Sequence, residues 1–180
     1  PMTVGQIPLY YNHKNTGRPA PVTFISDNSE MGTPVNPQNF NSKYIDIPNS
    51  PLFPFGFGLS YTKFDYSGLK LSSSVMTLKK GLSVSVIVKN TGAYDGEEVV
   101  QLYVKDITAS VTRPVLELKA FKKIMIKKNE SVNVEFTLNA SDLAFYNDKM
   151  EFVPEAGKFK IFVGTNSASL LDSDFELIDK

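Results

Sequence analysis

Apolar and polar residues alternate along several short stretches in the second half of the chain. The clearest is SVNVEFTL, residues 131–138, in which every second residue is apolar. The same alternation runs through residues 82–88, 100–104 and 159–163, and more weakly through 175–177. A period of two places alternate side chains on opposite faces of a strand. Each stretch therefore predicts a strand with one face on a core.

Turn-forming residues separate these stretches. Phe145-Tyr146 and residues 150–153 flank Asn147-Asp148-Lys149, which predicts a hairpin with a three-residue loop. Only residues 141–146 suit a helical turn, with Ser141 as its cap. About seven strands without a helix long enough for a crossover predict an all-β fold. We expect an immunoglobulin- or fibronectin-III-like antiparallel β-sandwich, preceded by an extended irregular Pro-rich segment.

The first third of the chain has a different composition, because nine of the eleven prolines lie within residues 1–54. Proline fixes φ and removes a backbone donor, so this part cannot form long helices or central strands. Residues 4–11 are strand-like but contain Pro8, which restricts them to an edge or an irregular stretch. We interpret this as a chain that starts inside another domain, whose surface would support the segment.

Composition excludes several classes of function. Nineteen Lys and Arg balance nineteen Asp and Glu. A nucleic-acid-binding surface needs an excess of basic residues, so we expect no nucleic acid as a partner. No apolar run reaches about 18 residues, so no membrane contact is expected. The absence of Cys and the single His13 remove disulfides, thiolate catalysis and the usual zinc sites. We expect no metal site and no cofactor.

Motifs for catalysis are incomplete. Residues 56–61 (GFGLSY) begin like a dinucleotide-binding fingerprint but lack the third glycine and a following helix. Residues 58–62 approach a nucleophile elbow but lack its closing glycine. Glu97 and Glu98 are adjacent on a predicted strand and must point to opposite faces. Asp172 and Asp174 share a face but lie in a polar stretch. We therefore assign no catalytic residue.

Two clusters are candidates for contacts with other groups. Residues 10–19 combine Tyr11, His13 and Arg18, a set that suits sugar hydroxyls or a carboxylate. The alternative is a turn with a solvent-facing imidazole and an Arg bonded to backbone carbonyls. Phe53, Phe55 and Phe57, followed by Tyr61, alternate with small or cyclic residues, which is typical of a linker packed between domains. Their rings are expected to point one way.

A cluster of five lysines surrounds Phe121, Ile124 and Ile126. The lysines are Lys119, Lys122, Lys123, Lys127 and Lys128. They could bind an anionic ligand, but on a strand they more commonly protect an exposed sheet edge from pairing.

Five segments together resemble the C-terminal end of family three glycoside hydrolases, above all bacterial periplasmic β-glucosidases. They are VGQIPLYYNHKNTGRP, SPLFPFGFGLSYTKFDYS, GEEVVQLYVKD, SVTRPVLELKAFKKI and EAGKFKIFVGTNS. The resemblance implies that residues 1–25 end an α/β sandwich domain, that 26–60 form a linker and that 61–180 form a fibronectin type III-like domain. One departure is Ala120, where relatives often have Gly before Phe.

The resemblance also implies a function. The parent enzyme would hydrolyse β-linked glycosides with retention, without a cofactor, and its catalytic acids would lie upstream of this chain. The chain would then be a non-catalytic accessory domain that braces the upstream catalytic domains, in a periplasmic or secreted protein. The alternative is a carbohydrate-binding module that tethers a polymeric β-glycan, with Tyr94 and Tyr103 in place of Trp. We expect the chain alone to be inactive. Its candidate interactions include weak contact with carbohydrate and association with a second copy as a homodimer.

Overall fold

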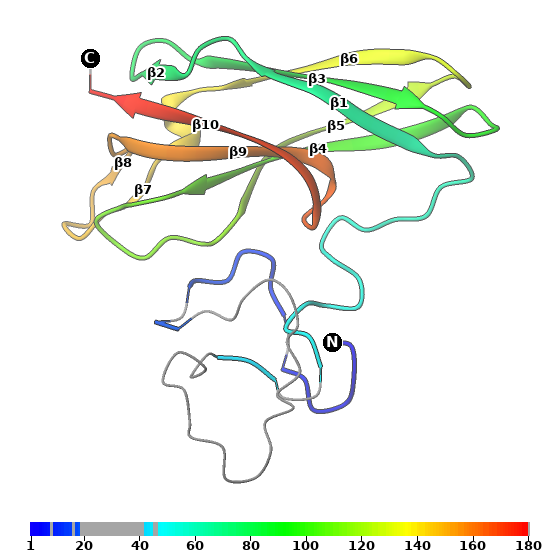
Figure 1. The fold of residues 1–180 in the computed structure, drawn as a ribbon. Coiled ribbons are helices and arrows are strands. Elements are labelled where there is room, and N and C mark those ends of the chain that lie inside the picture. Colours follow the sequence, from blue (N-terminus) through cyan, green and yellow to red (C-terminus); the bar gives the residue numbers. More distant parts are fainter. Residues whose placement is uncertain (8, 16, 19–41, 45–46, 180) are drawn as a thin grey trace, which may run out of the picture.

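The computed structural model describes residues 1–7, 9–15, 17–18, 42–44 and 47–179. Its main body is a β-sandwich of two sheets, and the N-terminal segment lies below it (Figure 1). The predicted all-β sandwich with a preceding irregular segment is confirmed. Within the described ranges, no helix is long and apolar enough to cross a membrane.

The smaller sheet has three antiparallel strands. Its strands are β1 (Phe64–Leu71), β3 (Leu82–Asn90) and β6 (Ser131–Leu138), in the order β1-β3-β6. The alternation predicted for β3 and β6 is confirmed, since alternate residues of both strands face the core; the apolar Ile87 of β3 lies on the outer face. Their polar residues, such as Ser83 and Glu135, lie on the outer face, where water satisfies their hydrogen bonds.

The larger sheet has five strands in the order β2-β10-β9-β4-β5. They are β2 (Val75–Thr77), β4 (Gly96–Asp106), β5 (Glu117–Ile126), β9 (Gly157–Asn166) and β10 (Ser169–Ile178). The expectation of purely antiparallel sheets is wrong at one pair, because β2 runs parallel to β10. A parallel pair within one sheet normally needs a long crossover. Here the chain reaches β2 from β1 in the opposite sheet, so no helix is required.

The core fills the space between the two sheets. Strand β1 contributes only partly buried side chains to it. The buried members come from the other long strands and include Val84, Val86, Val100, Leu102, Phe136, Ile161, Val163 and Phe175. Strand β5 lies at the edge of the larger sheet, so the interpretation of its lysines as edge protection fits the topology. Lys123 of this strand pairs with Glu97 of β4 at 2.6 Å.

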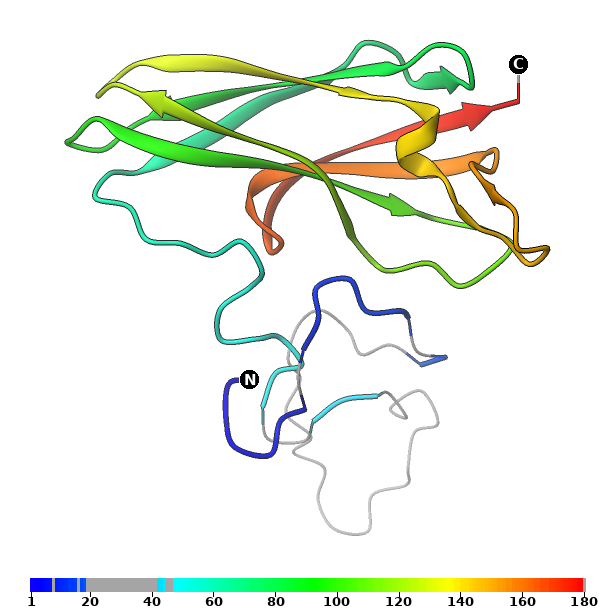
Figure 2. The ribbon, with the colours of Figure 1, turned by 180° about the vertical axis from the view of Figure 1, so that it is seen from behind.

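A short 3-10 helix, η2 (Ala140–Leu143), and a small hairpin connect β6 to β9 (Figure 2). The predicted cap Ser141 is wrong: the N-cap is Asn139, whose backbone amide donates to Asp142 Oδ2 at 2.7 Å. The predicted hairpin is confirmed, with β7 (Phe145–Tyr146) paired to β8 (Phe152–Val153). Its loop spans residues 147–151, longer than predicted, because the Asn147 side chain accepts from two further backbone amides.

The N-terminal part contains no strand among its described residues between 4 and 11, consistent with the effect expected of Pro8. The expected boundary between residues 25 and 26 lies outside the described residues. The boundaries at 25 and 60 therefore stay predictions.

Candidate functional site

Residues 100–104 of strand β4 are buried on both faces, which the alternating pattern did not predict. Val100, Leu102 and Val104 face the core, but Gln101 and Tyr103 on the outer face are also only 4% and 0% exposed. Segments that come much earlier in the chain cover this outer face, as the contacts below show. The sequence carries one signal of it, since residues 99–104 contain no charge, as expected of a strand buried on both sides.

Gln101 is the centre of the hydrogen bonds at this face. Its Oε1 accepts a hydrogen bond from the Tyr103 hydroxyl. Its Nε2 donates to the Thr165 carbonyl at 2.7 Å and, more weakly, to the Gly56 carbonyl at 3.4 Å. A buried amide is costly unless both its ends are bonded. Gln101 therefore links β4, β9 and the linker through one side chain.

The linker is held on the sheet by its backbone. The Phe55 carbonyl accepts from the Ser167 amide at 2.9 Å. Gly56 has a φ of +80°, and a Cβ at this position would lie 2.3 Å from Gln101 Oε1. Only glycine adopts this conformation without strain and leaves room for the amide. The GFG sequence, interpreted above as part of a packed linker, thus places a glycine where the backbone meets the sheet.

Tyr11 lies between the linker and the sheet. Its ring stacks on Phe55 with centroids 4.2 Å apart and meets Tyr103 edge-on at 5.9 Å. Such ring pairs are favourable beyond the area that they bury. Burial, with a smaller contribution from the nearby Tyr11, raises the pKa of Tyr103 to about 12. Three segments far apart in the sequence therefore meet in one aromatic stack.

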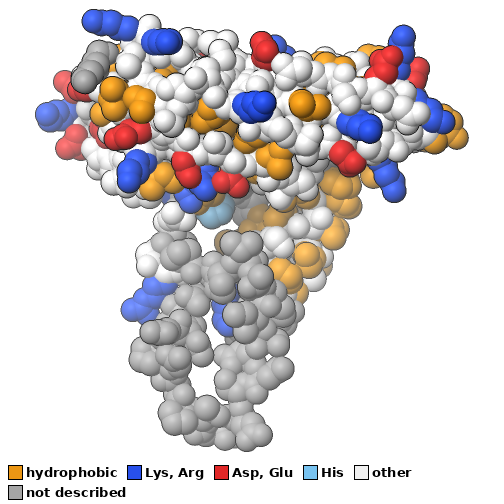
Figure 3. Space-filling model, turned by 45° about the horizontal axis from the view of Figure 1, so that its top comes forward, with side chains coloured by type: hydrophobic (Ala, Val, Ile, Leu, Met, Phe, Trp, Pro, Cys, Tyr) orange, Lys and Arg blue, Asp and Glu red, His pale blue; other side chains and the backbone are white. Residues whose placement is uncertain are grey.

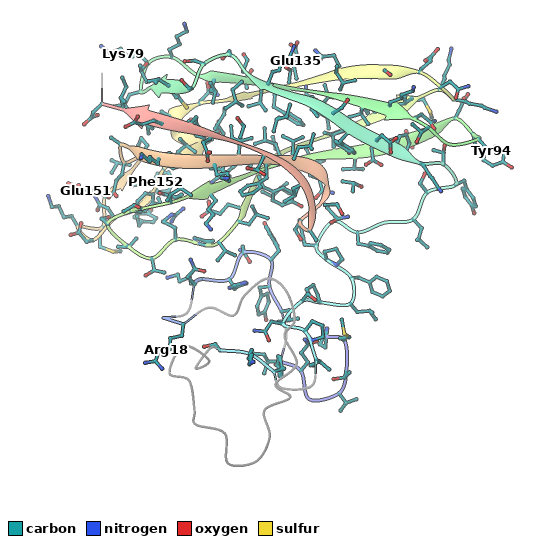
Figure 4. The ribbon with its side chains drawn as sticks, viewed as in Figure 1. Arg18, Lys79, Tyr94, Glu135, Glu151 and Phe152 are labelled. Atoms are coloured by element: carbon teal, nitrogen blue, oxygen red, sulfur yellow. The ribbon has the colours of Figure 1, made fainter. Side chains whose placement is uncertain are left out.

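The other two candidate residues of the N-terminal cluster have different surroundings. The His13 carbonyl accepts from the Val115 amide at 2.9 Å, and Lys14 forms a bridge with Pro114. The His13 ring is exposed and its Nδ1 lies 2.9 Å from the Lys14 carbonyl. Arg18 is also exposed and lies well away from the sandwich (Figure 4). The structure thus packs Tyr11 into the stack and leaves the His13 and Arg18 side chains in solvent.

The remaining linker aromatics are largely exposed. Phe53 and Phe57 pack on each other with centroids 4.9 Å apart, while Phe55 turns to Tyr11. The three rings therefore form two groups and do not point one way as expected. Phe53 is 62% exposed and Tyr61 is 95% exposed. Hydrophobic side chains gather below the sandwich, beside the part of the chain drawn in grey (Figure 3).

The two carboxylate pairs singled out in the sequence differ in their geometry. Glu97 and Glu98 point to opposite faces, as predicted: Glu97 pairs with Lys123 in solvent, whereas Glu98 is buried and accepts from the Tyr66 hydroxyl at 2.7 Å. Asp172 and Asp174 share a face and both contact one cation, Lys160. Across the described ranges, no group of three or more His, Cys, Asp or Glu side chains is placed to hold a metal ion.

Comparison with known proteins identifies relatives. Residues 98–167 match the family described as "Fibronectin type III-like domain". The chain is 43% identical to the "Periplasmic beta-glucosidase" of Salmonella typhimurium over 99% of its own length and 22% of the relative. It is 38% identical to a "Putative beta-xylosidase" of Formosa agariphila, covering 98% of this chain and 20% of the relative.

A solved structure agrees with these matches. The beta-glucosidase from Listeria innocua in complex with glucose superposes with a TM-score of 0.79 and 40% identity, over 96% of this chain and 22% of that one. The sandwich therefore defines the class as fibronectin type III-like. The chain is similar to a part of beta-glucosidases and beta-xylosidases, and it spans about a fifth of the length of the curated relatives named here.

Proposed function

We propose that this chain is the non-catalytic accessory part of a retaining β-glycosidase of the β-glucosidase type, and that it braces the catalytic domains that hydrolyse O-glycosidic bonds. Its partners are then the upstream domains of the same chain. The name of the Salmonella relative favours a periplasmic or secreted location. As part of this proposal, Tyr11, His13 and Arg18 would contact the substrate cleft of the longer enzyme.

The observation that supports the proposal is that the outer face of β4 holds both the N-terminal segment, through Tyr11, and the linker, through Gly56. Tyr11 packs on Tyr103 and Phe55 stacks on Tyr11, while Phe53, Phe55 and Phe57 remain 62%, 46% and 45% exposed. Burial of a Phe side chain contributes about 2 kcal/mol. A linker that is fixed on one side and apolar on the other is suited to bracing, because it can bind a second domain without losing further conformational entropy.

The test compares the longer protein with and without residues 61–180. Bracing predicts a lower thermal midpoint and lower activity after removal. A sharper version replaces Phe53 and Phe57 by Ser, with Phe121→Ser on the solvent-exposed edge strand β5 as the matched control. Equal midpoints and equal activity for all of these proteins would refute bracing.

The chain by itself should not turn over aryl β-glucosides, because no catalytic pair is assigned to it. Calorimetry with a soluble β-glucan distinguishes the carbohydrate-binding alternative, since bracing requires no affinity for the polymer. The aromatic row that this alternative would need cannot include Tyr103, which is fully buried.

A further inference from the structure

The loop between β4 and β5, residues 107–116, makes backbone contacts with the N-terminal segment. Val115 donates its backbone amide to the His13 carbonyl, and Pro114 bridges to Lys14. Loops of this kind are usually mobile unless side chains anchor them. The position of His13 and Lys14 on the sandwich therefore depends on what holds this loop.

The side chain of Arg113, directly before these two contact residues, is anchored in the end of the sandwich. Its NH2 group donates to Glu117 Oε1 at 2.6 Å, and Lys119 Nζ contacts the other oxygen of that carboxylate at 2.6 Å. The guanidinium lies 4.1 Å above the Phe145 ring. A planar cation with a bonded carboxylate and an aromatic face has little freedom to move.

One polar atom of Arg113 is left over. Its Nε is buried, and no group of the described residues accepts a hydrogen bond from it. Beside it lies a cavity of about 10 Å³, lined by the charged side chains of Asp106, Glu117 and Lys119 and by apolar Leu143 and Phe159. This volume is the size of a single water, and a buried N–H of this kind is costly unless something accepts from it.

We propose that the cavity is a site for one structural water, which accepts a hydrogen bond from Arg113 Nε and donates one to a lining carboxylate. Arg113, held in this way, fixes the backbone conformation of residues 113–115 that binds the N-terminal segment. Arg113 is a positioning residue for this contact. The inference does not depend on the proposed function, because both segments belong to this chain.

The main experiment measures amide hydrogen exchange in the 180-residue chain. Arg113→Lys keeps the charge but removes Nε and the planar stack, and Arg113→Met removes both charge and hydrogen bonds. Each should raise the exchange rate of the Val115 amide at least tenfold, while amides of the central strand β3 stay unchanged. Lys123→Met on strand β5 is the control, since Lys123 pairs with the exposed Glu97 and does not line the cavity.

Unchanged exchange at Val115 in both Arg113 variants would overturn the positioning role. If both variants fail to fold, Glu117→Gln serves instead, because it keeps the shape of the side chain that Arg113 contacts but removes its charge. Exchange of the Val115 amide should then also become faster. A high-resolution crystal structure of the unmodified chain tests the water separately. One water within hydrogen-bond distance of Nε is expected, and an empty or ion-filled cavity would refute that part.

Discussion

At the scale of single residues, the docking of the linker depends on Gln101 and Gly56. The Gln101 side chain forms hydrogen bonds with groups from three segments. Glycine is the only residue type that fits at position 56 beside this side chain. The contact stabilises the whole chain, because a displaced Gln101 would leave the buried Tyr103 hydroxyl without its acceptor.

Replacement of Gly56 by Ala should therefore weaken this contact. The new Cβ would meet the Gln101 amide at 2.3 Å in a backbone conformation with φ +80°. We expect the free energy of unfolding in urea to fall by about 1–3 kcal/mol. Gly58→Ala is the control, since a Cβ at Gly58 meets nothing within 4 Å. Equal stability of the two variants would show that the linker is not held through Gly56.

At the scale of elements, one hydrogen bond between side chains ties the two sheets together. The Tyr66 hydroxyl on β1 donates to the buried Glu98 on β4 at 2.7 Å. Burial, followed by the hydrogen bond to Glu98 and its negative charge, raises the pKa of Tyr66 above its ordinary value of 10.0. The folded protein thus holds the phenolic proton more tightly than the unfolded chain does.

This difference predicts a loss of stability in base. Below pH 10 both states keep the proton and the contribution is complete. Above pH 10 the unfolded chain releases it first, so the free energy of unfolding falls as the pH rises. Tyr66→Phe should lower the stability at neutral pH by about 1–3 kcal/mol, because Glu98 loses its donor, and should flatten the fall above pH 10.

The measurement is urea unfolding at a series of pH values between about 8 and 11.5. Tyr61→Phe is the control, since Tyr61 is exposed, and it should follow the unmodified protein throughout. A Tyr66→Phe curve parallel to the unmodified one would mean that this tyrosine does not couple folding to pH.

At the scale of the whole molecule, described residues of the segments before the sandwich cover one face of its larger sheet. The apolar core lies entirely within residues 64–177, so the sandwich has what it needs to fold alone. Its β4 face, however, is complete only when Tyr11, Phe55 and Gly56 cover Gln101 and Tyr103.

A chain of residues 61–180 should consequently fold but melt earlier than the full chain. Loss of even one kcal/mol lowers the midpoint of a chain of this size by roughly 2–4 °C. A chain of residues 53–180 retains the linker contacts and should melt between the other two. Calorimetry of the three chains checks the order, and identical midpoints for 1–180 and 61–180 would contradict it.

Much of the sandwich could be predicted from local pattern. The alternation at 82–88 and 131–138 identified β3 and β6 with their core faces, because burial of one face imposes a period of two. The opposite orientation of Glu97 and Glu98 followed from the same geometry. The cap at Asn139 and the longer hairpin loop were missed, because several nearby polar residues compete for the same backbone groups.

The candidate site was predictable only in part. An aromatic linker at 53–57 was expected from composition, but its partners were not, since Tyr11, Gln101 and Tyr103 are separated from it by about 45 residues on either side. On its own, the sequence determined which stretches form strands and which of their faces are apolar, because that information repeats every two residues. Only the tertiary structure decided that the polar face of β4 is also buried, because its cover comes from distant segments and local periodicity carries no record of them.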